Sequence, residues 1–372
     1  MTVLRRLIYR EVSGAVALVA VAFLGLFFFF DFIDELSSIG RPSPANPDLT
    51  YSLQLALMHV ALQVPNHAYE VMPIAVLIGT VFVFARLAQG SEYTILRTSG
   101  LGPWRALRLM MGLGLVFVAI TFVVGDYVAP AASKTAQMLQ ARFEGRVSVG
   151  GAGAWLKEKQ PYSQYSVNVN ALNAQGDLQG IRIFEFDNQG RLVSRTQAQR
   201  GRVDDQGGWQ LEQVTRTEFA AQGSDGSRVQ QRQMAAFLWP NSLTAEMVSV
   251  ALLRPDRMPT ADLYRYVQHL DANGQSSQRY ALEFWRKVFY PLSCLVMVVL
   301  ALPFAYLHFR SGGITGYVFG GVMIGISFFL LNNVFGYIGN LNHWVPWLAA
   351  ASPSLIYSLV SLTAFGWLVL RR

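Results

Sequence analysis

The stretch that decides the fold is VSGAVALVAVAFLGLFFFFDFI, residues 12–33, which contains a single charged side chain. It is long enough to cross a hydrocarbon layer of about 30 Å as a helix, since that takes roughly 20 residues. Arg5, Arg6 and Arg10 before it resemble the start of a secretory signal peptide. The apolar run is too long for such a peptide, and no clear small-residue cleavage site follows. We therefore expect a retained first transmembrane helix.

Five further apolar runs predict a total of six membrane spans. Of the 372 residues, 52% are hydrophobic and 14% charged, against roughly a quarter charged in soluble proteins. The net charge of +7 comes from arginines at the ends of apolar runs and in one polar block, without the basic stripe of a nucleic-acid-binding surface. The other predicted spans are Leu57–Ala85, Ala106–Ala129, Trp285–Leu307, Ile314–Tyr337 and Trp347–Leu370.

Basic residues in short loops predict the orientation, because cytoplasmic loops are enriched in lysine and arginine. The short loops on the opposite side offer only Arg41. We therefore expect both termini in the cytoplasm of a bacterium and the large polar block in the periplasm, with the spans in the inner membrane. The basic residues on the cytoplasmic side are Arg5, Arg6, Arg10, Arg86, Arg97, Arg105, Arg108, Arg310, Arg371 and Arg372.

The polar block has the pattern of β-strands. Tyr165, Val167, Val169 and Ala171 alternate with polar residues, and turn-forming clusters such as 187–190 punctuate the block. Short strands with regular turns predict a sandwich or jelly roll. After this block, an amphipathic helix is expected to start at Pro259 or Thr260 and to end near residues 273–274.

The predicted fold is thus a membrane α-helical protein with six transmembrane helices, split three and three around an inserted periplasmic all-β jelly-roll domain. The predicted domains are 1–129 with the first three spans and a cytoplasmic coupling loop at 86–108, 130–254 with the β domain, 255–282 as a helical linker, and 283–372 with the last three spans.

Motifs for enzyme chemistry are missing. The sequence has no GxxxxGK[ST] loop for nucleotide phosphates, no HExxH and no GxSxG. Its five histidines are far apart, and Cys294 is the only cysteine, so no disulfide within the chain is possible. We predict that the chain is not an enzyme and has neither a cofactor nor a metal site.

The cytoplasmic loop 86–108 contains a segment that can form a short helix. Ser91 can cap it, Glu92 lies at its start, and Arg97 lies at its end. One interpretation is an ordinary positively charged loop. The other is a coupling helix that docks into a cytoplasmic ATPase, with Arg86, Ser91, Glu92 and Arg97 as contact residues.

Two features of the last three spans allow both a structural and a functional interpretation. Gly316 and Gly320 belong to a small-residue spacing that lets helices approach closely, either as static packing or as a seam that opens against a partner subunit. Arg286 and Lys287 interrupt an apolar stretch, and they either extend to the membrane surface or contact an anionic lipid headgroup.

The chain resembles a known family, the lipopolysaccharide-export permeases LptF and LptG, and is more similar to LptG. The likeness extends over essentially the whole chain, in the order of spans and β domain and in local motifs. These motifs are Phe32-Ile33-Asp34-Glu35-Leu36, Ala88-Gln89-Gly90-Ser91-Glu92, Thr98-Ser99-Gly100, Gly125-Asp126-Tyr127-Val128-Ala129-Pro130, Leu263–Leu270 and Phe289-Tyr290-Pro291-Leu292-Ser293.

The resemblance implies a permease half of an ABC transporter that extracts lipopolysaccharide from the outer leaflet of the inner membrane. It implies a paired LptF-type permease, an LptB-type ATPase dimer that hydrolyses ATP, and LptC- and LptA-type periplasmic β-jellyroll proteins that carry the lipid toward the outer membrane. It also implies lateral gates lined by the first and fifth helices, with Phe28, Phe32, Gly316 and Gly320 as candidates.

One departure concerns the lipid phosphates. Where the family pattern has lysine near the outer end of the first helix, this chain has Asp31 and Asp34. The candidates for headgroup contacts are therefore Arg41, Lys134, Arg142, Arg286 and Lys287, or residues of the partner subunit. Two alternative functions remain: a permease of an efflux or lipoprotein-release ABC system, and a membrane scaffold or sensor without transport.

Overall fold

The computed structural model describes residues 2–42, 50–90, 92–98, 100–144, 153–172, 177–204, 208–219, 229–244, 247–248, 255–306 and 314–370. These residues form two compact units. The first, here called the helical unit, comprises Met1–Glu35, Val60–Ala132 and Gln278–Arg372. The second, the β unit, comprises Leu36–His59 and Ser133–Ser277.

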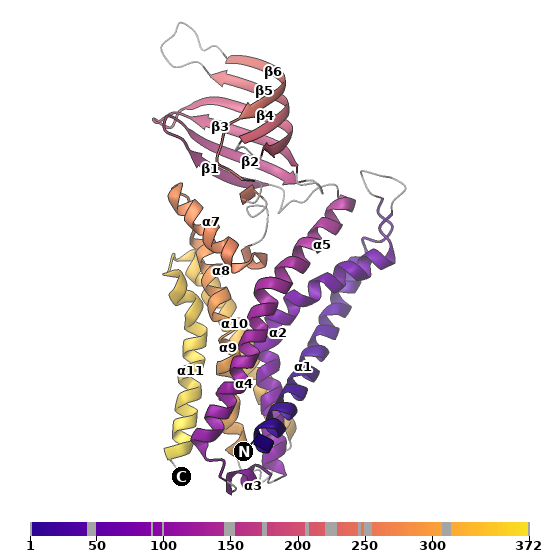
Figure 1. Ribbon diagram of the computed structural model, residues 1–372, viewed down its shortest axis with the longest axis vertical. Helices are drawn as coiled ribbons and strands as arrows, with labels where there is room; N and C mark the ends of the chain where they lie inside the picture. Colours follow the sequence, from indigo (N-terminus) through magenta and orange to yellow (C-terminus); the bar gives the residue numbers. More distant parts are fainter. Residues whose placement is uncertain are drawn as a thin grey trace. The chain divides into compact units, whose positions relative to one another are not determined.

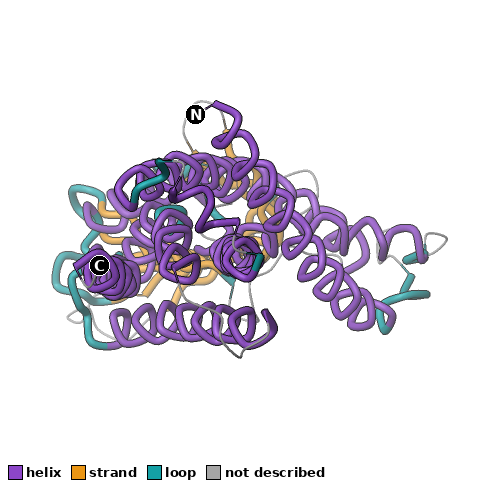
Figure 2. Tube along the Cα trace, turned by 90° about the horizontal axis from the view of Figure 1, so that it is seen from below, coloured by secondary structure: helices purple, strands orange, loops and turns teal. Residues whose placement is uncertain are grey.

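The helical unit is built from long apolar helices. In Figure 1, α3 and both chain termini lie at the same end of this unit, and Figure 2 shows the helices from that end. Its elements are α1 (Thr2–Leu36), α2 (Leu53–Gln89) from Val60 on, α3 (Glu92–Thr98), α4 (Pro103–Val123), the π-helical turn η1 (Val124–Val128), the first residues of α5 (Ala129–Glu144), α8 (Gln278–Phe289), α9 (Ser293–Ala301), the 3-10 turn η3 (Leu302–Tyr306), α10 (Ile314–Leu341) and α11 (Pro346–Leu370).

The predicted spans are present as helices. Five helical segments among the described residues are long and apolar enough to cross a membrane, and α8 together with α9–η3 forms a sixth candidate with a bend of 44°. The bend falls at Pro291, which cannot continue the backbone hydrogen bonding of a helix. The multi-pass membrane fold with an inserted β domain is therefore confirmed. The third span was expected to end at Ala129, whereas the helix continues through α5 to Glu144.

Glycines allow the helices of this unit to approach closely. A side chain on Gly114 of α4 would meet the Cα of Leu295 on α9 at 3.1 Å, and one on Gly339 of α10 would meet the Cβ of Ala349 on α11 at 2.5 Å. Because lipid tails are as apolar as leucine, close packing of this kind, rather than the hydrophobic effect, holds membrane helices together.

The β unit contains one antiparallel sheet in which each strand pairs with the next along the chain. Val167, Val169 and Ala171, which the alternation pattern selected, are buried. Burying each of the two valine side chains contributes roughly 1.5–3 kcal/mol. The strands are β1 (Ala154–Lys159), β2 (Gln164–Leu172), β3 (Leu178–Phe186), β4 (Leu192–Asp204), β5 (Gly208–Phe219) and β6 (Val229–Trp239), followed by η2 (Pro255–Arg257) and α7 (Thr260–Ala272).

The sheet is curved (Figure 1), and the segments directly after its two edge strands, β1 and β6, contact each other. The side-chain amide of Gln160, directly after β1, donates to the carbonyl of Pro240, directly after β6, at 3.1 Å. The backbone N–H of Ser242 donates to the buried Glu158 carboxylate at 2.9 Å. The strand order is a meander, and one face of the sheet carries buried residues such as Leu156, Val167 and Ile183.

Side chains that follow α7 protect the edge of β1. The backbone N–H groups of Lys157 and Lys159 donate to the side-chain oxygens of Gln275 and Asn273, each at 3.3 Å. Unpaired N–H groups on an edge strand otherwise invite pairing with another chain. Gly274, at φ +64°, provides the left-handed turn after this helix.

Candidate functional site

The short helix predicted in the cytoplasmic loop is present as α3, and Tyr93 anchors it. The Tyr93 ring is buried between Phe84 of α2 and Tyr306 of η3, with ring centroids 6.1 and 5.1 Å apart. Burial raises the pKa of the Tyr93 hydroxyl, which therefore stays protonated. On the exposed side of α3 lie Glu92, Arg97 and Ile95, the last with 61% of its surface exposed. This exposed face is the part of the helix that a partner protein can reach.

Of the other predicted coupling residues, Arg86 has a contact that its sequence position did not reveal. Its guanidinium donates to the carboxylate of Glu11 on α1 at 2.6 Å. Ser91 lies outside the described residues. Arg86 therefore connects the end of α2 with α1, while α3 begins only a few residues later.

The second half of α1 is largely uncovered. Leu26, Phe29, Phe30 and Ile33 each expose about half of their surface, from 45% to 56%. The predicted gate residues Phe28 and Phe32 lie among them and are half-buried. This exposed apolar surface on one helix is suited to contact with lipid or with another membrane subunit.

A polar pair lies within this apolar region. His67 of α2 and Asp31 of α1 are 2.7 Å apart between Nε2 and Oδ2, and both are about one-quarter exposed or less. The His67 ring stacks on Phe27, with centroids 4.7 Å apart and planes inclined by 5°. Phe27 and Asp31 share one face of α1, being four residues apart. One imidazole thus contacts both, and Asp31 faces α2.

The glycines of α10 form two stripes with different surroundings. Gly321 and Gly325 are buried, and side chains there would contact Val81 and Ile74 of α2 at 3.5 and 3.0 Å. The predicted gate residues Gly316 and Gly320 have open space where a side chain would lie. The first stripe packs α10 within the unit, and the second is accessible to a neighbouring molecule.

Lys287, a headgroup candidate from sequence, is buried with 6% of its surface exposed. Its ammonium group donates to the carbonyl oxygen of Gly125 in η1 at 3.0 Å. The Tyr69 ring covers Gly125, since a Cβ there would lie 2.3 Å from the ring. Lys287 therefore connects α8 to the π-helical turn.

Two neighbours of Lys287 also contact other helices. The hydroxyl of Tyr290 donates a hydrogen bond to the carbonyl oxygen of Glu70 at 2.5 Å. The neighbouring carbonyl, that of Tyr69, has no helical N–H partner, because residue 73 is a proline. Arg286 pairs with Glu283 at 2.9 Å and donates to the Asn333 side chain of α10 at 3.3 Å. Arg286 retains 25% side-chain exposure. It is thus a partly accessible cation between α8 and α10.

The remaining headgroup candidates belong to the β unit. Arg41 and Lys134 are exposed, and Arg142 lies in α5 with its side chain outside the described residues. Arg41 follows α1, whereas Lys134 lies in α5. No hydrogen bond or ion pair joins the described side chains of Arg41 and Lys134. Among the candidates with described side chains, Arg286 and Lys287 belong to the helical unit and Arg41 and Lys134 to the β unit, without a common set of contacts within either unit.

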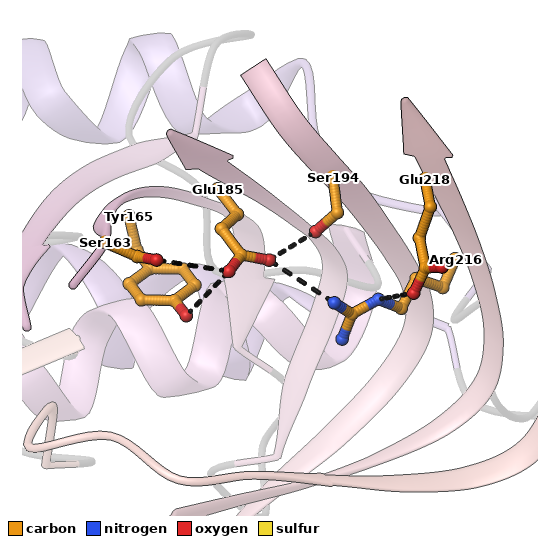
Figure 3. Close-up of polar contacts among 6 residues, drawn as sticks. All are labelled: Ser163, Tyr165, Glu185, Ser194, Arg216 and Glu218. Atoms are coloured by element: carbon orange, nitrogen blue, oxygen red, sulfur yellow. Dashed lines mark hydrogen bonds and ion pairs between the residues drawn. The ribbon is translucent and has the colours of Figure 1, made fainter. Parts of the chain in front are cut away.

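Inside the rolled sheet, a polar network centred on Glu185 borders the apolar core (Figure 3). The Glu185 carboxylate, 16% exposed, accepts hydrogen bonds from four side chains of neighbouring strands and turns. These are Ser163 at 3.3 Å, Tyr165 at 3.2 Å, Ser194 at 2.7 Å and Arg216 at 3.3 Å.

The Glu185 carboxylate has a counter-charge within the unit, the Arg216 guanidinium. Arg216 also lies 3.1 Å from Glu218 and 5.7 Å above the centre of the Phe237 ring. Burial, with the Glu185 charge adding to it, raises the pKa of Tyr165, whose hydroxyl therefore remains a donor. Glu185 shares its face of β3 with the buried Ile183, two residues away. The inner face thus changes from apolar to polar along β3.

A comparison with known proteins identifies the family. A family profile described as lipopolysaccharide export system permease LptF/LptG matches residues 6–370. The chain belongs to the LptF/LptG family. Lipopolysaccharide export system permease protein LptG of Escherichia coli strain K12 is 28% identical, over 100% of this chain and 98% of the relative. The LptG protein of Haemophilus influenzae is 26% identical, over 99% and 98%.

Membership of the LptF/LptG family confirms the resemblance found in the sequence, including its closeness to LptG. The family description and the names of both relatives are those of permease components of an export system. The match extends across both halves of the helical unit and the β unit between them, which favours export over the two alternative functions.

Sequence reasoning missed three contacts of this LptF/LptG permease. These are the Asp31–His67 pair, the Glu11–Arg86 pair and the anchoring of α3 by Tyr93. A signal was present for the first, because a histidine and an aspartate within apolar helices usually pair with one another. The partners themselves required the tertiary structure, since they are 36 and 75 residues apart in the first two cases.

Proposed function

We propose that the chain is the permease half of an ABC transporter that extracts lipopolysaccharide from the outer leaflet of the inner membrane and passes it to a periplasmic bridge toward the outer membrane. The observation that carries this proposal is the full-length match to the LptF/LptG family. The partly uncovered α1 and the outward glycine stripe of α10 support it, because a lipid must enter from the side through surfaces of this kind.

The physical chemistry of the substrate supports the same arrangement. Each buried CH₂ group contributes about 0.8 kcal/mol, so transfer of several acyl chains into water would cost tens of kcal/mol. A passage that offers one apolar surface after another removes most of this cost. The inner face of the β unit, with Leu156, Val167 and Ile183 buried on it, has the required apolar character.

The proposal includes partners and an orientation. An LptB-type ATPase dimer would bind the exposed face of α3, an LptF-type permease would pair with the helical unit, and LptC- and LptA-type proteins would receive the lipid. The termini and α3 lie at one end of the helical unit (Figure 1), and the arginines near them favour the cytoplasm for that end. The β unit, inserted between spans, would then lie in the periplasm.

Photo-crosslinking tests the proposed path. A photoreactive amino acid at Phe28 of α1 or Gly320 of α10 should form an adduct with lipopolysaccharide in membranes, and adduct yield should depend on ATP hydrolysis. The matched control is Leu359 of α11, which is 65% exposed but lies on neither predicted gate helix. Absence of adducts at both gate positions, or equal ATP-independent adducts at all three, would contradict the proposal.

Topology and ATPase association provide an independent check. Reporter fusions should place the loop with α3 in the cytoplasm and the β unit in the periplasm. The full chain purified from membranes should bring a nucleotide-binding ATPase with it. A cytoplasmic β unit would require the proposal to be abandoned.

A further inference from the structure

The two faces of the sheet differ in charge over its first three strands. The acidic side chains of β1, β2 and β3 belong to the inner face, where Glu158 is buried and Glu185 is 16% exposed. The opposite face of these strands, here called the outer face, carries only basic charges. These are Lys157, Lys159 and Arg182, and all three residues are exposed. The outer face is therefore positively charged, whereas the inner face is apolar and acidic.

Aromatic rings lie among these basic residues on the outer face. The ring of Trp155, a residue that is 51% exposed, stacks on Phe184 of β3 with centroids 6.0 Å apart and planes inclined by 20°. The guanidinium carbon of Arg195 on β4 lies 5.7 Å from the centre of the Phe184 ring. Offset stacking and a cation over a ring both stabilise such an arrangement. Trp155 thus forms a supported aromatic platform that is half open to solvent.

The strand register places the basic residues directly beside this platform. In one row across the sheet, Lys157 of β1 lies opposite Ser166 of β2, which in turn lies opposite Phe184 of β3. In the neighbouring row, Trp155 and Arg182 pair with the same residue of β2. Residues two apart on a strand share a face, and side chains directly opposite each other lie about 5 Å apart. A ligand on the Trp155 ring is therefore within reach of several cations.

A hollow of about 640 Å³ adjoins β1 in the same unit. Its lining includes Lys157, Lys159, Ser166, Asp271 and Asn273, which come from β1, β2 and the end of α7. The lysines offer donors to an anionic group, whereas the exposed Asp271 carboxylate accepts hydrogen bonds from hydroxyl groups. The volume is within the range of about 300–1,000 Å³ found for small-molecule sites. The hollow thus suits a ligand that carries both hydroxyl and anionic groups.

The basic side chains of the outer face are available to such a ligand. Lys157, Lys159 and Arg182 form no side-chain ion pair or hydrogen bond with another described residue. Other arginines of the β unit differ in this respect, since Arg191 and Arg202 each pair with an aspartate, at 2.9 and 3.1 Å. The positive charge of the outer face is therefore not neutralised by the described part of the unit.

We propose that the outer face of β1–β3 binds the anionic saccharide of the lipid substrate, an inference that rests on the proposed function. Sugar rings stack on Trp155 through their apolar C–H faces, and phosphate or carboxylate groups on the sugars bind Lys157, Lys159 and Arg182. An acidic protein surface would satisfy the charges alone, whereas the open tryptophan ring and the hollow with its hydroxyl acceptor favour a sugar.

The position of β1 connects the two parts of such a lipid. β1 is an edge strand of the sheet (Figure 1), so the inner and outer faces meet along it. The apolar inner face holds the acyl chains, as proposed above, and the outer face holds the sugars of the same molecule. An amphipathic substrate is thus matched by a sheet whose two faces have opposite character.

Binding of deacylated lipopolysaccharide tests the proposal. Complete alkaline deacylation leaves the phosphorylated saccharide without the chains that an apolar path would hold. Isothermal titration calorimetry of the full chain, with its co-purifying subunits in detergent, should show saturable binding. Trp155→Ala, Arg182→Gln and the double variant Lys157→Gln with Lys159→Gln should each weaken the affinity about 10-fold or more, as expected for the loss of a stacking or charge-assisted contact.

Matched substitutions in α7 separate this effect from a general change in the β unit. Tyr264→Ala removes a ring from a residue that is 52% exposed, close to the value for Trp155. Arg265→Gln removes an exposed guanidinium that is paired with Asp262. Both variants should bind the saccharide like the unaltered chain. An unchanged affinity in all the outer-face variants, or an equal loss in the two α7 variants, overturns the proposal.

Two competitors identify the class of ligand. Dextran, a neutral saccharide, and inorganic phosphate should each fail to displace deacylated lipopolysaccharide at equal concentration. Complete displacement by phosphate would show a simple anion site, and complete displacement by dextran would show that the basic residues are not required. Either result overturns the anionic saccharide as the ligand.

The saccharide site and the proposed function can fail separately. Lipopolysaccharide adducts at Phe28 and Gly320 report on export, whereas calorimetry reports on the outer face. If the outer-face variants weaken saccharide binding while no adduct forms at the gate positions, the saccharide site stands and the proposed function fails. If adducts form normally while the variants bind the saccharide normally, the saccharide site alone fails.

Discussion

The ammonium nitrogen of Lys287 lies 3.0 Å from the carbonyl oxygen of Gly125, so a buried cation of α8 caps the π-helical turn that follows α4. The wider hydrogen-bonding pattern of a π-turn disturbs the regular pairing of backbone groups. In a membrane protein, water is not available to replace a missing partner. The lysine expected to contact a lipid headgroup thus binds the protein's own backbone.

Replacing Lys287 should destabilise the helical unit. Lys287→Met removes the donor and leaves the Gly125 carbonyl without this partner, at a cost of about 1–3 kcal/mol. The thermal midpoint of the detergent-solubilised full chain should fall by several degrees. Lys134→Met, a change to an exposed lysine, should leave the midpoint unchanged. Equal midpoints in both variants would show that the Lys287 contact contributes no stability.

The two glycine stripes of α10 should respond differently to the same substitution. Gly325→Leu introduces a side chain against Ile74 of α2, so the variant should lose several kcal/mol and accumulate poorly in the membrane. Gly320→Leu, on the outward stripe of the same helix, should accumulate normally. It should nevertheless reduce co-purification of a partner permease, if that stripe is the seam between subunits. Similar membrane levels for both variants would contradict the packing described for α10.

Substitutions in α3 should distinguish residues that bind the ATPase from residues that hold α3 on the helical unit. Glu92→Ala changes only the exposed face, and it should reduce the amount of ATPase that co-purifies with the chain without lowering its thermal midpoint. Tyr93→Ala removes a buried ring from between Phe84 and Tyr306. It should lower the free energy of unfolding by an amount typical of a core aromatic, about 3–5 kcal/mol, and the thermal midpoint should fall with it. Normal ATPase recovery with Glu92→Ala would remove the coupling role of this residue.

The stability of the β unit should decrease as the pH is lowered through the range in which histidine titrates. Burial lowers the pKa of His269 in α7, and the nearby Glu158 charge offsets part of this effect. The unfolded chain, with an ordinary pKa of about 6.5, then binds a proton at a higher pH than the folded chain. The contribution of His269 to stability is therefore fully present above that value and is lost as the pH falls below it.

Hydrogen exchange of the full chain measures this dependence. Protection of the β1 amides, corrected for the intrinsic effect of pH on exchange, should fall between pH 7.5 and 5.5. The His269→Gln variant should show a smaller fall, because it lacks the titrating ring. An identical pH profile in the two proteins would exclude His269 as the group responsible.

Hydropathy and strand alternation in the sequence were sufficient to predict the membrane helices and the strands, but not the contacts between them. The apolar runs predicted six spans, and the alternation around Val167 and Val169 predicted buried strand faces. The third helix exceeded its predicted end because residues 129–144 are polar enough to look like a loop, yet they have high helix propensity, with several alanines and glutamines. The bend in the fourth span was visible in the sequence only as Pro291, which does not specify an angle.

Site residues were predictable as types but not as contacts. Glu92 and Arg97 were recognised from their position in a short capped helix, and both are exposed. Gly316 and Gly320 were grouped with the glycines that follow them, yet a shift of one position along a helix turns a residue by 100° and selects a different neighbour. From the sequence, Lys287 was a candidate for contact with a lipid headgroup. In the structure it binds the carbonyl oxygen of Gly125, which lies 162 residues earlier in the chain.

The sequence alone determined the membrane class, the insertion of a β domain between two groups of spans and the family, because hydropathy and strand alternation are local properties that a bilayer and a sheet impose on every turn or pair of residues. Only the tertiary structure decided which polar groups face each other: the side chains of Asp31 and His67, those of Glu11 and Arg86, and the Lys287 ammonium group with the Gly125 carbonyl. Inside an apolar environment each polar group must find a partner within about 3 Å, and residues that meet at that distance come from helices that the sequence lists far apart.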